Sequence, residues 1–215
     1  MSTSLLTELY IEQVEKHWPK SGKHILAQYT ENSVVVYQAF NQAIADYAIE
    51  NQRFGGPAFS YDRMSWVKPN FLWMTYRCGW ASKKQQERVL AVTITKEGFE
   101  EILQNAYTVH RERKEGKTKK DINIRLQWDP DHAPDYTKQE RKAIQLGLKN
   151  DVLKKYGNEW ILKIEDITDF VKEQYRVLQN DGIEHLMVPR ERVYHPSTQD
   201  ICEKIELDTA LSDTL

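Results

Sequence analysis

Clustered basic and aromatic side chains make residues 63–87 the part of this chain best suited to chemistry. The cluster consists of five cations and four aromatic residues: Arg63, Lys68, Arg77, Lys83, Lys84, Trp66, Trp73, Tyr76 and Trp80. A guanidinium group can hold a phosphate through two hydrogen bonds, and an aromatic face can stack on a base or a nicotinamide ring. The segment therefore predicts a pocket for a nucleotide or for nucleic-acid phosphate. The alternative is a buried helix whose cations reach solvent or pair with acids.

A second group of polar side chains follows the predicted strand at residues 122–128. Strand alternation places Arg125, Gln127 and Asp129 on one face, at a sheet end where side chains often converge on ligands. Asp129 could orient a ribose hydroxyl or act as a base, and Arg125 could hold an anion. The alternative is that Asp129 and the following proline form a turn, capped by the carboxylate.

Three further polar residues are candidates for the same site. Tyr37 and Gln38 come near the junction of a buried strand with a helix N-terminus, where anions are often bound. Glu87 follows the basic run directly and is a candidate catalytic carboxylate. The alternatives are a core tyrosine whose hydroxyl is satisfied locally, and a Glu87 that pairs with Arg63 or Arg77.

The motifs of common enzyme classes are absent from the sequence. It contains no P-loop, no GxGxxG, no GxSxG, no HExxH and no CxxC pair. The spacing of Asp129, Asp131 and His132 matches no common ligand set, so we predict no metal site. Cys78 lies in an apolar segment, which favours a buried inert thiol over a reactive one.

Composition limits the classes of protein that remain. The 215 residues carry a formal net charge of -2, so any anion site must be local rather than part of a general basic surface. Two widely separated cysteines argue against a disulfide framework and favour a reducing cytoplasm. The first 18 residues do not resemble a signal peptide, and no apolar run approaches a membrane span, so no membrane partner is predicted.

Hydrophobic patterns predict alternating strands and helices. The predicted strands are residues 33–40, 88–95, 122–128 and 159–168, of which the first is a β-branched run typical of a strand buried on both faces. The predicted helices are residues 41–54 with Asn41 as N-cap, 70–78, 99–107, 137–157 and 169–181. The helix at 137–157 depends on a capping-box pattern, Thr137 followed by Glu140. The charged run at 110–121 is expected to be an exposed loop.

This order of elements predicts an α+β fold: a single domain with a central mixed β-sheet flanked by helices. Strands 33–40, 88–95 and 122–128 are expected at the centre of the sheet. We expect a helical extension at residues 1–24, the domain at 25–196 and a frayed polar tail at 197–215. The sequence specifies no oligomeric state.

Four segments of the chain resemble a known family. They are VVVYQAFNQAIADYAIENQRF, RMSWVKPNFLWMTYRCGWASKKQQERVLAVTI, RLQWDPDH and RKAIQLGL. They are similar to the bacterial and fungal domain of unknown function numbered 4291, over roughly residues 25–196. That resemblance implies no particular reaction.

The order of candidate residues also resembles the layout of ADP-ribosyltransferases. In those enzymes an early-strand residue and a late-strand acid hold the two ends of NAD. The counterparts implied here are Tyr37 and either Asp129 or Glu87. This is a similarity of arrangement without a shared short motif.

The leading hypothesis is a nucleotide-using transferase of ADP-ribosyltransferase-like type, with NAD as cofactor. Its phosphate-binding residues would be Arg63, Lys68 and Arg77, and Glu87 or Asp129 would act on the ribose. The residues that would stack on a ring are Trp73, Tyr76 and Trp80. One alternative is a non-catalytic RNA- or DNA-binding module that also uses the basic loop at 114–120. The other is a structural or partner-binding domain, in which the tryptophans are core and the charges are paired.

Overall fold

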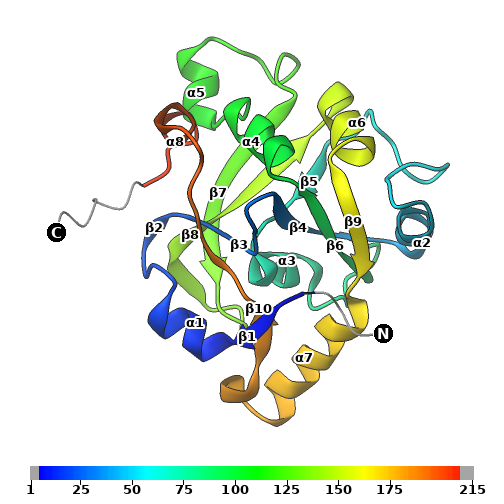
Figure 1. The fold of residues 1–215 in the computed structure, drawn as a ribbon, viewed down its shortest axis with the longest axis vertical. Helices are drawn as coiled ribbons and strands as arrows, with labels where there is room; N and C mark the ends of the chain where they lie inside the picture. Colours follow the sequence, from blue (N-terminus) through cyan, green and yellow to red (C-terminus); the bar gives the residue numbers. More distant parts are fainter. Residues whose placement is uncertain (1–4, 209–215) are drawn as a thin grey trace.

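Two β-sheets, joined edge to edge, form the frame of the structure, a computed structural model that describes residues 5–208 (Figure 1). One sheet is antiparallel, with the strand order β4-β6-β9. The other is mixed: β8 pairs with β2 in parallel and with β5 and β7 in antiparallel fashion. These seven strands are β2 (Gly22–Lys23), β4 (Ser33–Phe40), β5 (Ser65–Val67), β6 (Arg88–Thr95), β7 (Ile124–His132), β8 (Lys138–Leu148) and β9 (Ile161–Asp166). An isolated bridge between Tyr37 and Lys68 joins β4 to the end of β5.

Two short antiparallel pairs and the helices complete an α+β fold, as predicted. The pairs join β1 (Thr7–Leu9) to β10 (Met187–Pro189), and β3 (Ile25–Ala27) to β11 (Arg192–Tyr194). The helices are α1 (Tyr10–Lys16), α2 (Gln42–Asn51), α3 (Phe71–Cys78), α4 (Lys96–Gln104), α5 (Val109–Lys114), α6 (Asn150–Asn158), α7 (Thr168–Asn180), the 3₁₀ helix η1 (Ile183–His185) and α8 (Gln199–Lys204). Within residues 5–208, every helix is too short or too polar to span a lipid bilayer.

Strand β4 separates two hydrophobic clusters, which explains why both of its faces are apolar. Val34 and Val36 belong to one cluster, together with residues from α4 and α6. Val35 and Tyr37 belong to the other, together with residues from α3. The prediction of a strand buried on both faces is therefore confirmed, and α3 is anchored on the Tyr37 side of the sheet.

The predicted helix at 137–157 was wrong in its first half. Residues 138–148 form β8, the central strand of the mixed sheet, and only Asn150–Asn158 are helical. Five of the last seven residues of β8 are buried, without strict alternation, so the apolar pattern did not distinguish strand from helix. Gly147 fits the strand because an added Cβ would lie 2.6 Å from Met64 Sδ.

Other predictions need correction at the edges of the domain. The strand at 122–128 extends to His132 and pairs with β8, not with the strands at 33–40 and 88–95. The charged run at 110–121 includes α5 rather than only loop. Part of the expected tail is ordered: α8 buries Ile201 and Cys202. Residues 5–24 contain two strands as well as α1, and β1 pairs with β10. Residues 1–4 and 209–215 of the predicted termini lie outside the described part of the chain.

One packing contact gives a stability prediction. Gly98 in the first turn of α4 lies against Trp160, and an added Cβ would be 2.5 Å from the Trp160 Cγ atom. We expect Gly98→Ala to lower the free energy of unfolding by roughly 1–3 kcal/mol, because overpacking outweighs the better helix propensity of alanine. Urea unfolding would measure this, with exposed Glu97→Ala in the same turn as control. Equal stability of the Gly98→Ala variant and the wild type would contradict the packing.

Candidate functional site

A row of polar side chains crosses the junction of the sheets, with one residue each from β4, β7 and β8 and one from the position directly after β5. Tyr37 of β4 and Lys68 exchange backbone hydrogen bonds, with N–O distances of 2.7 and 3.2 Å. Lys68 follows the pair Val67–Leu146, which aligns it with Gln145 of β8. Gln145 in turn lies opposite Gln127 of β7. Because opposite residues of antiparallel strands share a face, these side chains project to one side. We call Tyr37, Lys68, Gln145 and Gln127 the polar row.

Gln145 holds the acid that lies beside this row. Its amide Nε2 donates to Asp129 Oδ2 at 2.6 Å and to Gln127 Oε1 at 3.0 Å. Two of the predicted site residues are therefore positioned by a third that sequence reasoning missed. The predicted helix at 137–157 hid it, because in a helix Gln145 would not face Gln127.

Lys68 is the most unusual member of the row. Its side chain is buried, 5% exposed, yet it makes no hydrogen bond or ion pair with any residue in the described part of the chain. Burial, and secondly the positive charge of Arg77, lower the pKa of Lys68 to about 8, although Cys78 and Asp129 act in the opposite direction. The exposed Arg77 of α3 likewise has no ion-pair partner among residues 5–208. Two neighbouring cations without an ion-pair partner in the described chain favour a negatively charged ligand between them.

Tyr37 is the member of the polar row whose buried polar atom is unsatisfied. Its hydroxyl is fully buried and has no hydrogen-bond partner among the described residues. Burial, and to a smaller extent the charge of Glu191, raise the pKa of Tyr37 well above its usual value, so the hydroxyl stays protonated and can donate. Buried polar groups are normally hydrogen-bonded, so such an orphan is typical of a strained or ligand-binding position.

The aromatic residues predicted to stack on a ligand divide into two groups. Trp73 and Tyr76 stack on each other, with ring centroids 5.3 Å apart, and Tyr76 stacks on His132 at 3.7 Å. Burial lowers the pKa of His132, which favours a neutral ring in this stack. Trp80 packs in the core against Phe71 and does not join them.

Trp66 is an aromatic residue on the same face as the polar row. It lies two residues before Lys68 on β5 and so projects from the same face. It is half-buried and lies over Gly147, where an added Cβ would be 3.0 Å from Trp66 Cζ2. The exposed face of the Trp66 indole, on the same side of the sheet as Lys68, can therefore stack on an aromatic ring of a ligand.

A buried carboxylate fixes α3 above this face of the sheets. Glu191 Oε1 accepts a hydrogen bond from Phe71 N at 2.6 Å, and Asn70 Nδ2 donates to Glu191 Oε2 at 2.9 Å. Asn70 also caps the helix by accepting from Trp73 N at 2.7 Å. Burial raises the pKa of Glu191 well above its usual value. The hydrogen bonds that it accepts at the start of α3 nevertheless set the position of the helix and hence of Arg77.

The remaining predicted site residues lie away from the polar row or are already engaged. Gln38 faces the other side of β4, where it bonds Ser65, the Trp66 carbonyl and the Tyr156 hydroxyl. Arg125 pairs with Glu112 of α5 at 3.6 Å.

Arg63 and Glu87 belong to a separate region. Arg63 lines a pocket of about 390 Å³ with Gln85, between β4 and the start of β5. Glu87 accepts a hydrogen bond from the Gln85 backbone at 2.8 Å. Neither of the ion pairs considered for Glu87, with Arg63 or with Arg77, is formed. The structure thus gathers Tyr37, Lys68, Gln127 and Asp129, with Arg77 nearby, and leaves Arg63 and Glu87 apart.

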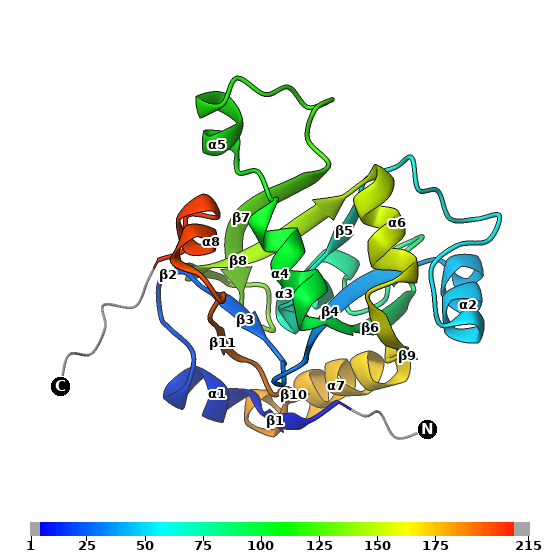
Figure 2. The ribbon, with the colours of Figure 1, turned by 45° about the horizontal axis from the view of Figure 1, so that its top comes forward.

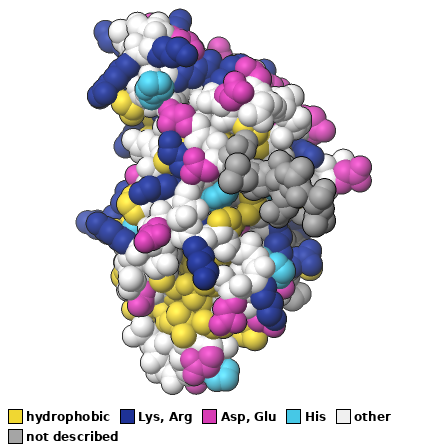
Figure 3. Space-filling view, turned by 90° about the vertical axis from the view of Figure 1, so that its left-hand side faces the viewer, with side chains coloured by type: hydrophobic (Ala, Val, Ile, Leu, Met, Phe, Trp, Pro, Cys, Tyr) yellow, Lys and Arg dark blue, Asp and Glu magenta, His cyan; other side chains and the backbone are white. Residues whose placement is uncertain are grey.

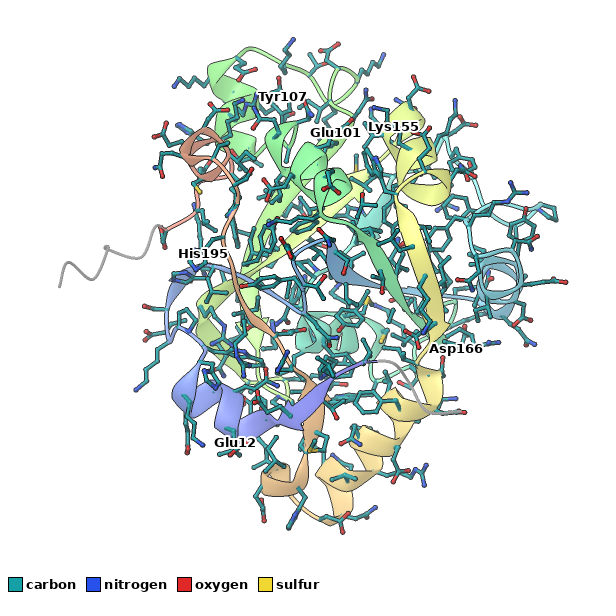
Figure 4. All side chains as sticks on the ribbon, viewed as in Figure 1. Glu12, Glu101, Tyr107, Lys155, Asp166 and His195 are labelled. Atoms are coloured by element: carbon teal, nitrogen blue, oxygen red, sulfur yellow. The ribbon has the colours of Figure 1, made fainter. Side chains whose placement is uncertain are left out.

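Within residues 5–208, no group of three or more His, Cys, Asp or Glu side chains is arranged to hold a metal ion. Two acids outside the site, Glu101 and Asp166, form ion pairs that join neighbouring elements of the fold. Figure 4 shows Glu101 of α4 beside Lys155 of α6, an ion pair of 2.8 Å that joins the two helices. Asp166, at the end of β9, pairs with Arg88 of β6.

Comparison with known protein families gives a match. The model of a family described as "Domain of unknown function (DUF4291)" matches residues 24–194. No curated protein matches the chain.

Proposed function

This chain belongs to the family DUF4291, and we propose that its polar row and Arg77 bind the phosphates of a nucleotide, NAD first among candidates, for transfer of an ADP-ribosyl group. The observation that supports the proposal is Lys68, a buried cation without an anionic partner in the described chain. A buried charge is unfavourable unless paired, so its retention favours a ligand that supplies the pair.

The other residues suit the remaining parts of such a ligand. The diphosphate would lie between Lys68 and Arg77, because a guanidinium and an ammonium together match its charge. The Tyr37 hydroxyl would donate to a phosphate or ribose oxygen, since it has no other described partner. The half-buried Trp66 offers a face for the nicotinamide or adenine ring.

Asp129 is the group proposed to act on the ribose. One of its oxygens is held by Gln145, which leaves the other for a ribose hydroxyl or for the acceptor. In the transfer, the bond between ribose C1′ and nicotinamide nitrogen breaks, and its electron pair leaves with neutral nicotinamide. A bond then forms between C1′ and an acceptor oxygen or nitrogen, whose proton passes to Asp129 and on to solvent.

Two variants separate binding from chemistry. We expect Lys68→Met to weaken NAD binding at least about tenfold in calorimetry, because a hydrogen bond to a charged group contributes roughly 1.5–3 kcal/mol. Asp129→Asn should keep most of the binding but slow nicotinamide release by about 10²–10⁴-fold, the usual contribution of a general base. Nicotinamide can be followed by chromatography.

The matched control is Lys172→Met, which removes an exposed cation from α7. It should bind and turn over NAD as the wild type does. The proposal fails if none of NAD, ATP and GTP binds below millimolar concentration. It also fails if Lys68→Met binds NAD as tightly as the control does.

A further inference from the structure

A basic arm projects from the body of the domain. It consists of α5 and the loop after it, residues 109–121, and Figure 2 shows it extending away from the sheets. Five of its cations are exposed and form no ion pair with any described residue: Arg113, Lys114, Lys117, Lys119 and Lys120. Figure 3 shows Lys and Arg side chains gathered at the upper end of the face that carries α5.

The acids of the arm do not neutralise these cations by pairing. Glu112 pairs with Arg125, and Asp121 accepts two hydrogen bonds from Thr118. Glu115 accepts from Arg111 and from the hydroxyl of Tyr107, which lies at the base of the arm (Figure 4). Each acid is therefore used to shape the arm, and the cations remain available to a partner.

The loop of the arm is also fastened to the body. Lys149 Nζ donates to the backbone carbonyls of Lys119 and Lys120, at 3.0 and 3.4 Å. A loop held through its carbonyls presents its side chains outward. This reduces the conformational entropy that a binding partner would otherwise have to remove.

A pocket of about 530 Å³ lies at the foot of the arm, along β7. Its lining includes His110 and Arg113 from α5, and Trp128 and Asp129 from β7. The indole of Trp128 is half-buried and fixed, because its Nε1 donates to the Ile205 carbonyl at 2.7 Å. A fixed aromatic face next to cations is a platform on which a base can stack.

We infer that the arm and this pocket bind single-stranded nucleic acid, with successive phosphates on the arm and one base against Trp128. A formal net charge of -2 leaves no general attraction for polyanions, so the binding is confined to the arm. An anionic membrane fits less well, because the only large hydrophobic side chain exposed on the arm is Val109. This inference goes beyond the proposed function and does not require NAD.

Charge reversal on the arm tests the inference. Fluorescence polarisation would follow a labelled 20-nucleotide RNA and its DNA equivalent with the full-length protein. Lys117→Glu, Lys119→Glu and Lys120→Glu, combined, should weaken binding by more than tenfold and make its dependence on log salt concentration shallower by about 2, since each single-strand phosphate contact contributes roughly 0.7. The matched control combines Lys16→Glu, Lys20→Glu and Lys172→Glu, three exposed residues in or near α1 and α7. Figure 1 shows these helices at the opposite end of the molecule from α5.

Trp128→Leu separates stacking from charge. It should weaken oligonucleotide binding at least about fivefold but leave binding of heparin, which has no bases, unchanged. Circular dichroism melting would verify that this variant is folded. Equal weakening by the two charge-reversal variants would overturn the inference, as would binding to phosphatidylserine vesicles without binding to either oligonucleotide.

The test is independent of the proposed function. The arm variant should bind NAD as the wild type does, because its three substituted lysines lie on the loop after α5 and Lys68 follows β5. Asp129, which borders both the polar row and the pocket at the foot of the arm, is unchanged in this variant. Loss of oligonucleotide binding without loss of NAD binding would show that the arm binds the oligonucleotide and is not needed for NAD. If the wild type binds the oligonucleotide but no nucleotide, the inference stands and the proposed function fails.

Discussion

At pH 7, the Lys68→Met variant is expected to be more stable than the wild type by about 3 kcal/mol, the equivalent of a pKa lowered from 10.5 to about 8. Methionine has a similar length but no charge to bury, so it removes the desolvation penalty without leaving a large cavity. Most substitutions of buried residues lower the free energy of unfolding. An increase for Lys68→Met would therefore be a distinctive result.

The dependence on pH has a definite direction. Since the folded-state pKa of Lys68 is lowered, the unfolded chain binds more protons between about pH 8 and 10.5. Wild-type stability therefore rises with pH across this window, and the penalty is fully present below it. Urea unfolding at pH 7 and pH 10.5 should show the advantage of Lys68→Met at the lower pH and little difference at the higher.

The exposed Lys172→Met variant is the control, because it should differ from the wild type by less than about 0.5 kcal/mol at both pH values. A Lys68→Met variant that is less stable than the wild type would mean that Lys68 makes a favourable contact within the protein. In that case Lys68 would not need an anionic ligand to compensate its buried charge.

Asp131→Ala is expected to cost about 3–5 kcal/mol of unfolding free energy, because it leaves a buried cation without a counter-charge. Asp131 and Arg141 are 1% and 5% exposed, and Arg141 Nη2 lies 2.6 Å from Asp131 Oδ2. Arg141 also donates to the Pro19 carbonyl at 2.7 Å and stacks over Trp18. The pair therefore links β7, β8 and the N-terminal segment, next to the strand end that carries Asp129.

A double variant shows how much of this loss comes from the stranded charge. Asp131→Leu with Arg141→Met should recover most of the stability, since a buried ion pair can often be replaced by apolar side chains at little cost. Chemical unfolding of both single variants and the double variant gives the coupling energy. If Asp131→Ala alone costs less than about 1 kcal/mol, the pair is not the buried ionic contact described above.

The sequence predicted most of the antiparallel sheet and half of the site for a clear physical reason. Local patterns sufficed for 33–40 and 88–95, because their apolar residues need no knowledge of partners. The same alternation placed Gln127 and Asp129 together on one strand face, as found. Helix α3 was also predictable, since Asn70 caps it and Gly79 ends it in the left-handed conformation.

The features that the sequence did not predict depend on contacts between residues distant in sequence. Gln145 joins the row only because residues 138–148 form a strand, and that strand is stabilised by pairing with β7 and β5 rather than by its own propensity. Arg63 and Lys68 are close in sequence but lie at different sites. Lys68 directly follows β5 and belongs to the polar row, whereas Arg63 lies before β5 and lines a separate pocket. Clustering of charge along a chain does not determine clustering in space.

The central claim is that the buried Lys68 ammonium binds an anionic nucleotide. Titration of Lys68 itself tests this claim most directly. The ¹³Cε chemical shift of Lys68, assigned by comparison with Lys68→Met, can be followed by NMR against pH with and without saturating NAD. The account predicts a pKa of about 8 in the free protein and a clear rise toward 10.5 when a phosphate becomes its partner. A Lys68 pKa that is the same with and without NAD, or already near 10.5 in the free protein, would contradict it.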